Sequence, residues 1–218
     1  MDRRTRRIAR IICRATVLTR FFSTIVLALL LVADAPARAQ RSAVTLPRNL
    51  SELTTLADRI VQGTVVSARV EPHPVYKNLT TVVVTLNVQD TLKGQATQNL
   101  TFRQFIWDPR DISQGAGYRP GQQVLLFLNR PTSIGLTSPV GLDQGRFHIT
   151  ADPSGPTALN GNGNSNLMSG VIASGRLNPS GLSPHSRTAI TQFQSGPIDL
   201  TALKESVHAM LQNGSSAK

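Results

Sequence analysis

The spacing of apolar positions predicts a helix at each end of the main body of the chain. Over residues 49–58, apolar side chains recur at helical intervals, and Asn49 and Glu52 form the pattern of a capping box. The same spacing returns over residues 199–212, where Asp199 is placed to cap the first turn. Each helix carries one apolar face, so both are expected to pack on a sheet.

Between these helices the pattern predicts short strands. Residues 80–90 alternate apolar with polar side chains, as a half-buried antiparallel strand does. Within the strand at residues 122–128, the Val-Leu-Leu-Phe-Leu run is apolar on both faces, so it is expected to lie under the helix or at the centre of a barrel. Gly63 interrupts a β-branched run and predicts a bulge or a close approach. The predicted strands are 60–70, 80–90, 98–106, 122–128, 134–136 and 145–150. This pattern predicts a mainly β fold, a small OB-like antiparallel β-barrel over residues 40–150.

The composition changes at residue 151. From residue 151 to 197, 25 of 47 residues are Gly, Pro, Ser or Asn. Such a segment is expected to be a loop or an arm, partly disordered, between the barrel and a C-terminal helix over residues 198–212. Its Gly-Asn-Gly-Asn-Ser-Asn run at 161–166 has the spacing of a calcium loop but lacks the carboxylates that such a site needs.

The first 39 residues have the organisation of a secretory signal peptide. Residues 3–20 are rich in Arg, Phe21–Ala33 is a mostly apolar run of 13 residues, and Ala37-Arg38-Ala39 is a small-x-small cleavage signal. The apolar run is shorter than the roughly 20 residues that span a bilayer. We therefore expect cleavage after Ala39, a periplasmic or secreted protein, and no transmembrane segment once the signal is removed.

More than half of the net charge of +11 belongs to the leader. Residues 1–39 hold eight Arg and two Asp, a local +6, which leaves +5 for residues 40–218. These remaining basic residues are never adjacent in the chain, and the predicted strands hold few aromatic side chains for base stacking. The sequence therefore predicts no nucleic-acid partner.

Cysteine usage excludes several kinds of site. Cys13 is the only cysteine and lies in the leader, so the mature chain is predicted to be cysteine-free. It would have no disulfide, no cysteine-based metal site and no cysteine nucleophile, and its stability would depend on its core. An exported chain of this kind points to a bacterial envelope.

Several segments together resemble a family of uncharacterised exported bacterial proteins. The resemblance extends from about Leu50 to Leu211. It is carried by Leu56–Val65, Leu92–Gly94, Tyr118–Leu128, Val140–Phe147, Asn160–Asn164 and Gly196–Leu200. More distantly, the strand beginning Ala57-Asp58 and the later Lys93-Gly94 turn resemble the OB-type barrels of netrin-like modules and of tissue inhibitors of metalloproteases. Those inhibitors engage a protease metal through an N-terminal cysteine, which this chain lacks, so the resemblance implies the fold alone.

No catalytic signature is present in the sequence. There is no His-Glu-x-x-His, no Gly-x-Ser-x-Gly and no phosphate-binding Gly-x-x-x-x-Gly-Lys-Ser/Thr. The four histidines, His73, His148, His185 and His208, fall on different predicted elements. We therefore predict no metal site and no cofactor.

The best candidate for a site is the loop at 107–119, which interrupts the strands. Loops at the end of a barrel that carry aromatic and charged side chains are common binding surfaces. The predicted ligand-binding residues are Trp107, Asp108, Arg110, Asp111 and Tyr118. The alternative is that Trp107 and Tyr118 close the end of the barrel while the two aspartates shape turns.

Three functions follow from these observations. The preferred one is an exported, non-catalytic module that binds an unidentified protein or another envelope component. The second is a hydrolase-type enzyme that uses Asp108 or Asp111 with His148. The third is an accessory or inhibitor-like protein associated with a protease.

Overall fold

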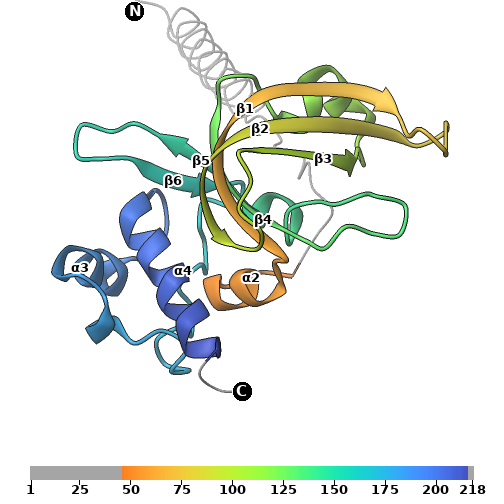
Figure 1. Ribbon diagram of the computed structural model, residues 1–218. Helices are drawn as coiled ribbons and strands as arrows, with labels where there is room; N and C mark the ends of the chain where they lie inside the picture. Colours follow the sequence, from red (N-terminus) through yellow and green to blue (C-terminus); the bar gives the residue numbers. More distant parts are fainter. Residues whose placement is uncertain (1–45, 216–218) are drawn as a thin grey trace, which may run out of the picture. The chain divides into compact units, whose positions relative to one another are not determined.

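Seven strands form one antiparallel sheet in the computed structural model, which describes residues 46–215. Their order across the sheet is β3-β2-β1-β4-β5-β6-β7, and the sheet is not closed. Figure 1 shows the long, curved β1–β2 hairpin that dominates it. The strands are β1 Arg59–Pro72, β2 Thr80–Lys93, β3 Asn99–Phe105, β4 Gln123–Leu128, β5 Arg146–Thr150, β6 Thr157–Asn160 and β7 Ile198–Asp199. The expectation of a mainly β fold with helices at both ends is confirmed, whereas an OB-like barrel is not. The predicted leader and its cleavage site lie outside the described residues.

The helices begin where the sequence places capping residues. In α2 (Leu50–Leu56), Asn49 Oδ1 accepts from the Glu52 N–H at 3.0 Å, and Glu52 Oε2 accepts from the Asn49 N–H at 2.9 Å. At the start of α4 (Leu200–Ser215), Asp199 Oδ1 accepts from the Ala202 N–H at 2.7 Å. Both predicted caps are confirmed. The remaining helical segments are η1 Pro109–Gly117, η2 Leu142–Gly145, η3 Pro179–Gly181 and α3 Pro184–Gln192. None of the helices in residues 46–215 combines the length and apolar character needed to cross a membrane.

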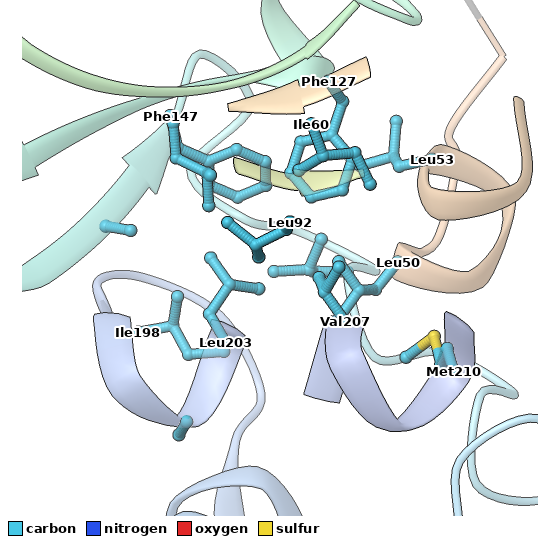
Figure 2. Close-up of a cluster of buried hydrophobic side chains, with 14 of the residues drawn as sticks. Leu50, Leu53, Ile60, Leu92, Phe127, Phe147, Ile198, Leu203, Val207 and Met210 are labelled. Carbon is cyan, nitrogen blue, oxygen red and sulfur yellow. The ribbon is translucent and has the colours of Figure 1, made fainter. Parts of the chain in front are cut away.

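Strand β4 separates two hydrophobic cores. Leu125 and Phe127 point to one face, where α2 and α4 cover the sheet, as Figure 2 shows for the Phe127 side. Val124, Leu126 and Leu128 point to the other face, into the curve formed by β1, β2 and β3. All five side chains are at most 2% exposed. The prediction that the apolar run at 124–128 is covered on both sides is confirmed.

Gly63 allows β1 and β2 to approach closely. The register between the strands shifts between Gln62 and Gly63, and a Cβ atom at Gly63 would lie 2.6 Å from the carbonyl oxygen of Asn87. No side chain fits at that distance, so the predicted bulge and close approach are both present.

The predicted strand at 134–136 does not form. Gly135 has a φ of 77°, and its N–H donates to the carbonyl of Thr132 at 2.9 Å, which closes a turn. Only Leu136 forms a single bridge, to Arg103 of β3. Glycine in the left-handed region ends the extended conformation here.

Residues 151–197 are more ordered than their composition suggests. The segment holds β6, η3 and α3. Leu167, Val171 and Leu177 are each at most 1% exposed and belong to the core beneath α2 and α4. The segment predicted as a loop or arm therefore contributes to the main core.

Candidate functional site

The sheet places Trp107 at the end where the long β1–β2 hairpin turns. Strand β3 ends at Phe105, and the next residue, Ile106, donates its N–H to the carbonyl of Thr80 at 3.1 Å. Thr80 begins β2 and pairs with Pro72 at the end of β1. Trp107 therefore follows β3 at the end of the sheet where β1 turns into β2, and the arrowheads of β1 and β3 point to this end in Figure 1.

Trp107 is exposed in a defined orientation. Its side chain is 69% exposed, although tryptophan is usually buried for most of its area. The ring meets that of Phe105 edge to face, with centroids 4.9 Å apart and an interplanar angle of 89°. Val75 and Tyr76, in the hairpin turn, are 73% and 45% exposed. We call Val75, Tyr76, Phe105 and Trp107 the tip surface.

His73 fixes the turn that carries Val75 and Tyr76. Its Nδ1 accepts from the N–H groups of both residues, at 3.2 and 3.0 Å, so the ring hydrogen is on Nε2 and is donated to the Ile134 carbonyl at 2.9 Å. The imidazole is 3% exposed, and its ring is tilted against the Tyr76 ring, with the two ring centroids 5.3 Å apart. The sequence shows His73 only as an isolated histidine between two prolines, which gives no sign of this role.

Asp108 and Arg110 pair with each other. Asp108 caps η1 by accepting from the Arg110 N–H at 2.9 Å, and its Oδ2 also accepts from Arg110 Nη2 at 2.5 Å. Their side chains are 20% and 70% exposed. Asp111 donates its backbone N–H to the Asp108 carbonyl. The two aspartates therefore shape the start of η1, as the alternative interpretation of this loop expects.

Tyr118 points away from solvent, unlike Trp107. Gly115 and Ala116 both adopt left-handed backbone conformations, which bend the chain at the end of η1. Tyr118 is then 2% exposed, its hydroxyl donates to Gln104 Oε1 at 3.0 Å, and the guanidinium of Arg146 lies 4.9 Å from the centre of its ring. Of the predicted site residues, Tyr118 belongs to the core and not to the tip surface.

Burial raises the pKa of Tyr118 to about 12, because the phenolate would lose its solvation. Between pH 10, where an unfolded tyrosine ionises, and pH 12, the unfolded chain has lost a proton that the folded chain keeps. The free energy of unfolding should therefore fall as the pH rises through this window. Phenolate absorbance of the wild type and of Tyr118→Phe should assign the late ionisation step to Tyr118. A late step that survives the substitution would contradict the burial.

Arg146 joins the end of η1 to η2. It donates to the carbonyl of Ala116 at 2.6 Å and to Asp143 Oδ1 at 2.5 Å, and it is largely buried. Ala116 occupies a left-handed conformation that costs a non-glycine residue roughly 1–2 kcal/mol, and this hydrogen bond helps to hold it there.

The side-chain amide of Gln122 forms a hydrogen bond with His148. Gln122 Nε2 donates to His148 Nδ1 at 2.5 Å. Burial lowers the pKa of His148, and the charge of Arg146 lowers it further, while Asp143 is the carboxylate that opposes this shift. The predicted hydrolase residues thus have separate hydrogen-bond partners, Arg110 for Asp108 and Gln122 for His148.

Within residues 46–215, no three side chains of His, Cys, Asp or Glu gather as a metal site would require. An open hollow of about 430 Å³ lies beside α2, between Arg48, Glu52 and Arg176. Glu52 already accepts from the Asn49 N–H in the capping box. No residue of the tip surface lines this hollow.

Comparisons with known proteins found no match to this chain, whether among protein-family models, curated proteins or solved structures.

Proposed function

We propose that this protein is a non-catalytic binding module of the bacterial envelope and that the tip surface is where it contacts its ligand. The observation that carries the proposal is the 69% exposure of Trp107, whose ring is held edge to face against Phe105. The envelope location is inferred from the signal-peptide pattern of residues 1–39.

Physical reasoning favours Trp107 as the centre of this contact. Tryptophan and tyrosine contribute most strongly to binding when an interface covers them. The Phe105 ring and the hydrogen bonds of His73 order Trp107 and Tyr76 before binding, so little conformational entropy is lost on association. Asp108 and Arg110 neutralise each other and leave Trp107 as the exposed aromatic residue of the loop.

The OB-like barrel belongs to the same proposal. Strands β1 to β4 enclose the core around Leu126, and the chain after β4 bridges Leu136 to Arg103 of β3. That bridge lies where a further strand would close a barrel. The arrangement supports the resemblance to netrin-like modules as a proposal about fold, without their cysteine-dependent inhibition.

The two other candidate functions have less support. A hydrolase would need a carboxylate from Asp108 or Asp111 to orient His148, and the hydrogen bond from Gln122 occupies the Nδ1 of that ring. A role beside a protease, as an accessory or inhibitor-like protein, would use the same tip surface with a protein partner.

Affinity capture from native envelope extract tests the proposed function. Wild-type protein should retain a component that Trp107→Ala retains at least about tenfold less well, because the indole is the largest exposed apolar group of the tip surface. Leu159→Ala is the matched control, since it also removes an exposed apolar side chain, 36% exposed, from β6. Equal capture by wild type and Trp107→Ala would refute the assignment of the surface.

A further inference from the structure

We propose that the tip surface docks on a bilayer rich in anionic phospholipid, an inference that rests on the proposed function and names its ligand class. Tryptophan and tyrosine favour the interface between lipid headgroups and acyl chains, because each combines an apolar ring with a polar atom. Trp107, Tyr76 and Val75 lie at one end of the sheet, where the longest hairpin in the described part of the chain turns. The turn of this hairpin projects beyond the end of β3 in Figure 1.

The charges near the tip surface suit an anionic membrane. Arg69 and Lys77 are exposed and form no ion pair within residues 46–215. The nearby acidic Glu71 is paired with Arg103 at 2.6 Å, just as Asp108 is paired with Arg110. Asp111 is the remaining carboxylate on the adjoining loop. Lysine and arginine beside an inserted apolar group add electrostatic attraction to anionic headgroups.

The exposed area of the tip surface suits attachment to a bilayer. Its three most exposed side chains, Trp107, Tyr76 and Val75, offer on the order of 400 Å². A few aromatic and aliphatic side chains beside basic residues are enough for reversible attachment to a membrane surface.

Trp107 allows this inference to be tested directly, because it is the only tryptophan in the chain. Protein recovered from the envelope of expressing cells, with its leader processed as in the cell, is mixed with vesicles of phosphatidylglycerol and phosphatidylethanolamine. Vesicles of phosphatidylcholine are the neutral comparison. With the anionic vesicles, Trp107 emission should shift to shorter wavelength and be quenched by brominated acyl chains. Added salt should weaken the interaction.

Vesicle flotation of variants identifies the residues responsible. Trp107→Ala should reduce the bound fraction by about tenfold or more, and Lys77→Gln by about fivefold. Leu159→Ala should float like the wild type. Circular dichroism and thermal unfolding of each variant show that the fold is retained, and Lys77→Gln keeps the fluorophore if Trp107→Ala is unstable.

Any of the following results would overturn the inference. Wild-type protein that stays unbound, binds neutral vesicles equally well or binds independently of Trp107 excludes docking of the tip surface on anionic lipid. If vesicles are not bound but Trp107→Ala loses a captured envelope protein, the proposed function stands with a protein ligand. If light scattering shows a dimer that Trp107→Ala abolishes, the tip surface contacts a second copy.

Discussion

Replacing Asn164 by alanine should lower the free energy of unfolding by about 3 kcal/mol. Asn164 is fully buried, and its side chain makes three hydrogen bonds. Its Oδ1 accepts from the Asn160 N–H at 2.9 Å, and its Nδ2 donates to the carbonyls of Ala158 and Gly196 at 2.9 and 2.8 Å. Alanine would leave all three backbone groups without these partners in the interior.

Asn166→Ala is the matched control for Asn164→Ala. Both residues have a left-handed backbone, with φ of 62° at Asn166 and 55° at Asn164, so the conformational penalty of alanine is the same. Asn166 is exposed, however. Urea unfolding followed by circular dichroism should therefore show a much larger loss for Asn164→Ala than for Asn166→Ala. Equal losses would mean that backbone conformation, and not the buried hydrogen bonds, explains the effect.

Replacing Phe127 by alanine should cost about 4 kcal/mol, which is the largest loss expected from a single truncation in the core beneath the helices. The Phe127 ring is 0% exposed and packs against Phe147 with centroids 5.5 Å apart. Figure 2 shows it among side chains from α2 and the sheet, with Leu50 and Leu53 on one side. The surrounding strands are expected to relax only partly into the space that alanine would leave.

Phe193→Ala provides the comparison for Phe127→Ala. Phe193 is only partly buried at the edge of the same core, so its truncation should cost less than half as much. Chemical denaturation of both variants measures the difference in the free energy of unfolding. A loss for Phe127→Ala no larger than that for Phe193→Ala would contradict the central position of Phe127.

Local signals explain which elements the sequence predicts well. The capping box of Asn49 and Glu52 and the Asp199 cap act within three residues, so they can be recognised without tertiary information. The apolar run of β4 is covered on both faces, and Gly63 marks a close approach to Asn87. These features follow from side-chain size and spacing alone.

Residues 151–197 show where this reasoning fails. Their apolar side chains follow neither a helical nor a strand period, because turns rather than regular elements carry Leu167 and Val171 into the core. Their order depends on distant contacts, such as the Leu50 N–H donating to the Leu167 carbonyl and Asn164 donating to Gly196. Composition predicts flexibility when it is considered without these partners.

The candidate site was predictable only in part. Sequence places Trp107 and Tyr118 on one loop, but their exposure depends on groups far along the chain. Arg146 and Gln104 hold Tyr118 inside, whereas Trp107 follows the outward face of β3. His73 orders the hairpin turn through backbone hydrogen bonds, which leave no pattern in the sequence.

Comparing the binding and the stability of Trp107→Ala tests the central claim most directly. The claim is that Trp107 serves contact with a ligand and not the fold. Since its side chain is 69% exposed, the variant should unfold within about 1 kcal/mol of the wild type and yet lose the captured envelope component. Full binding by a stable Trp107→Ala protein would contradict the claim.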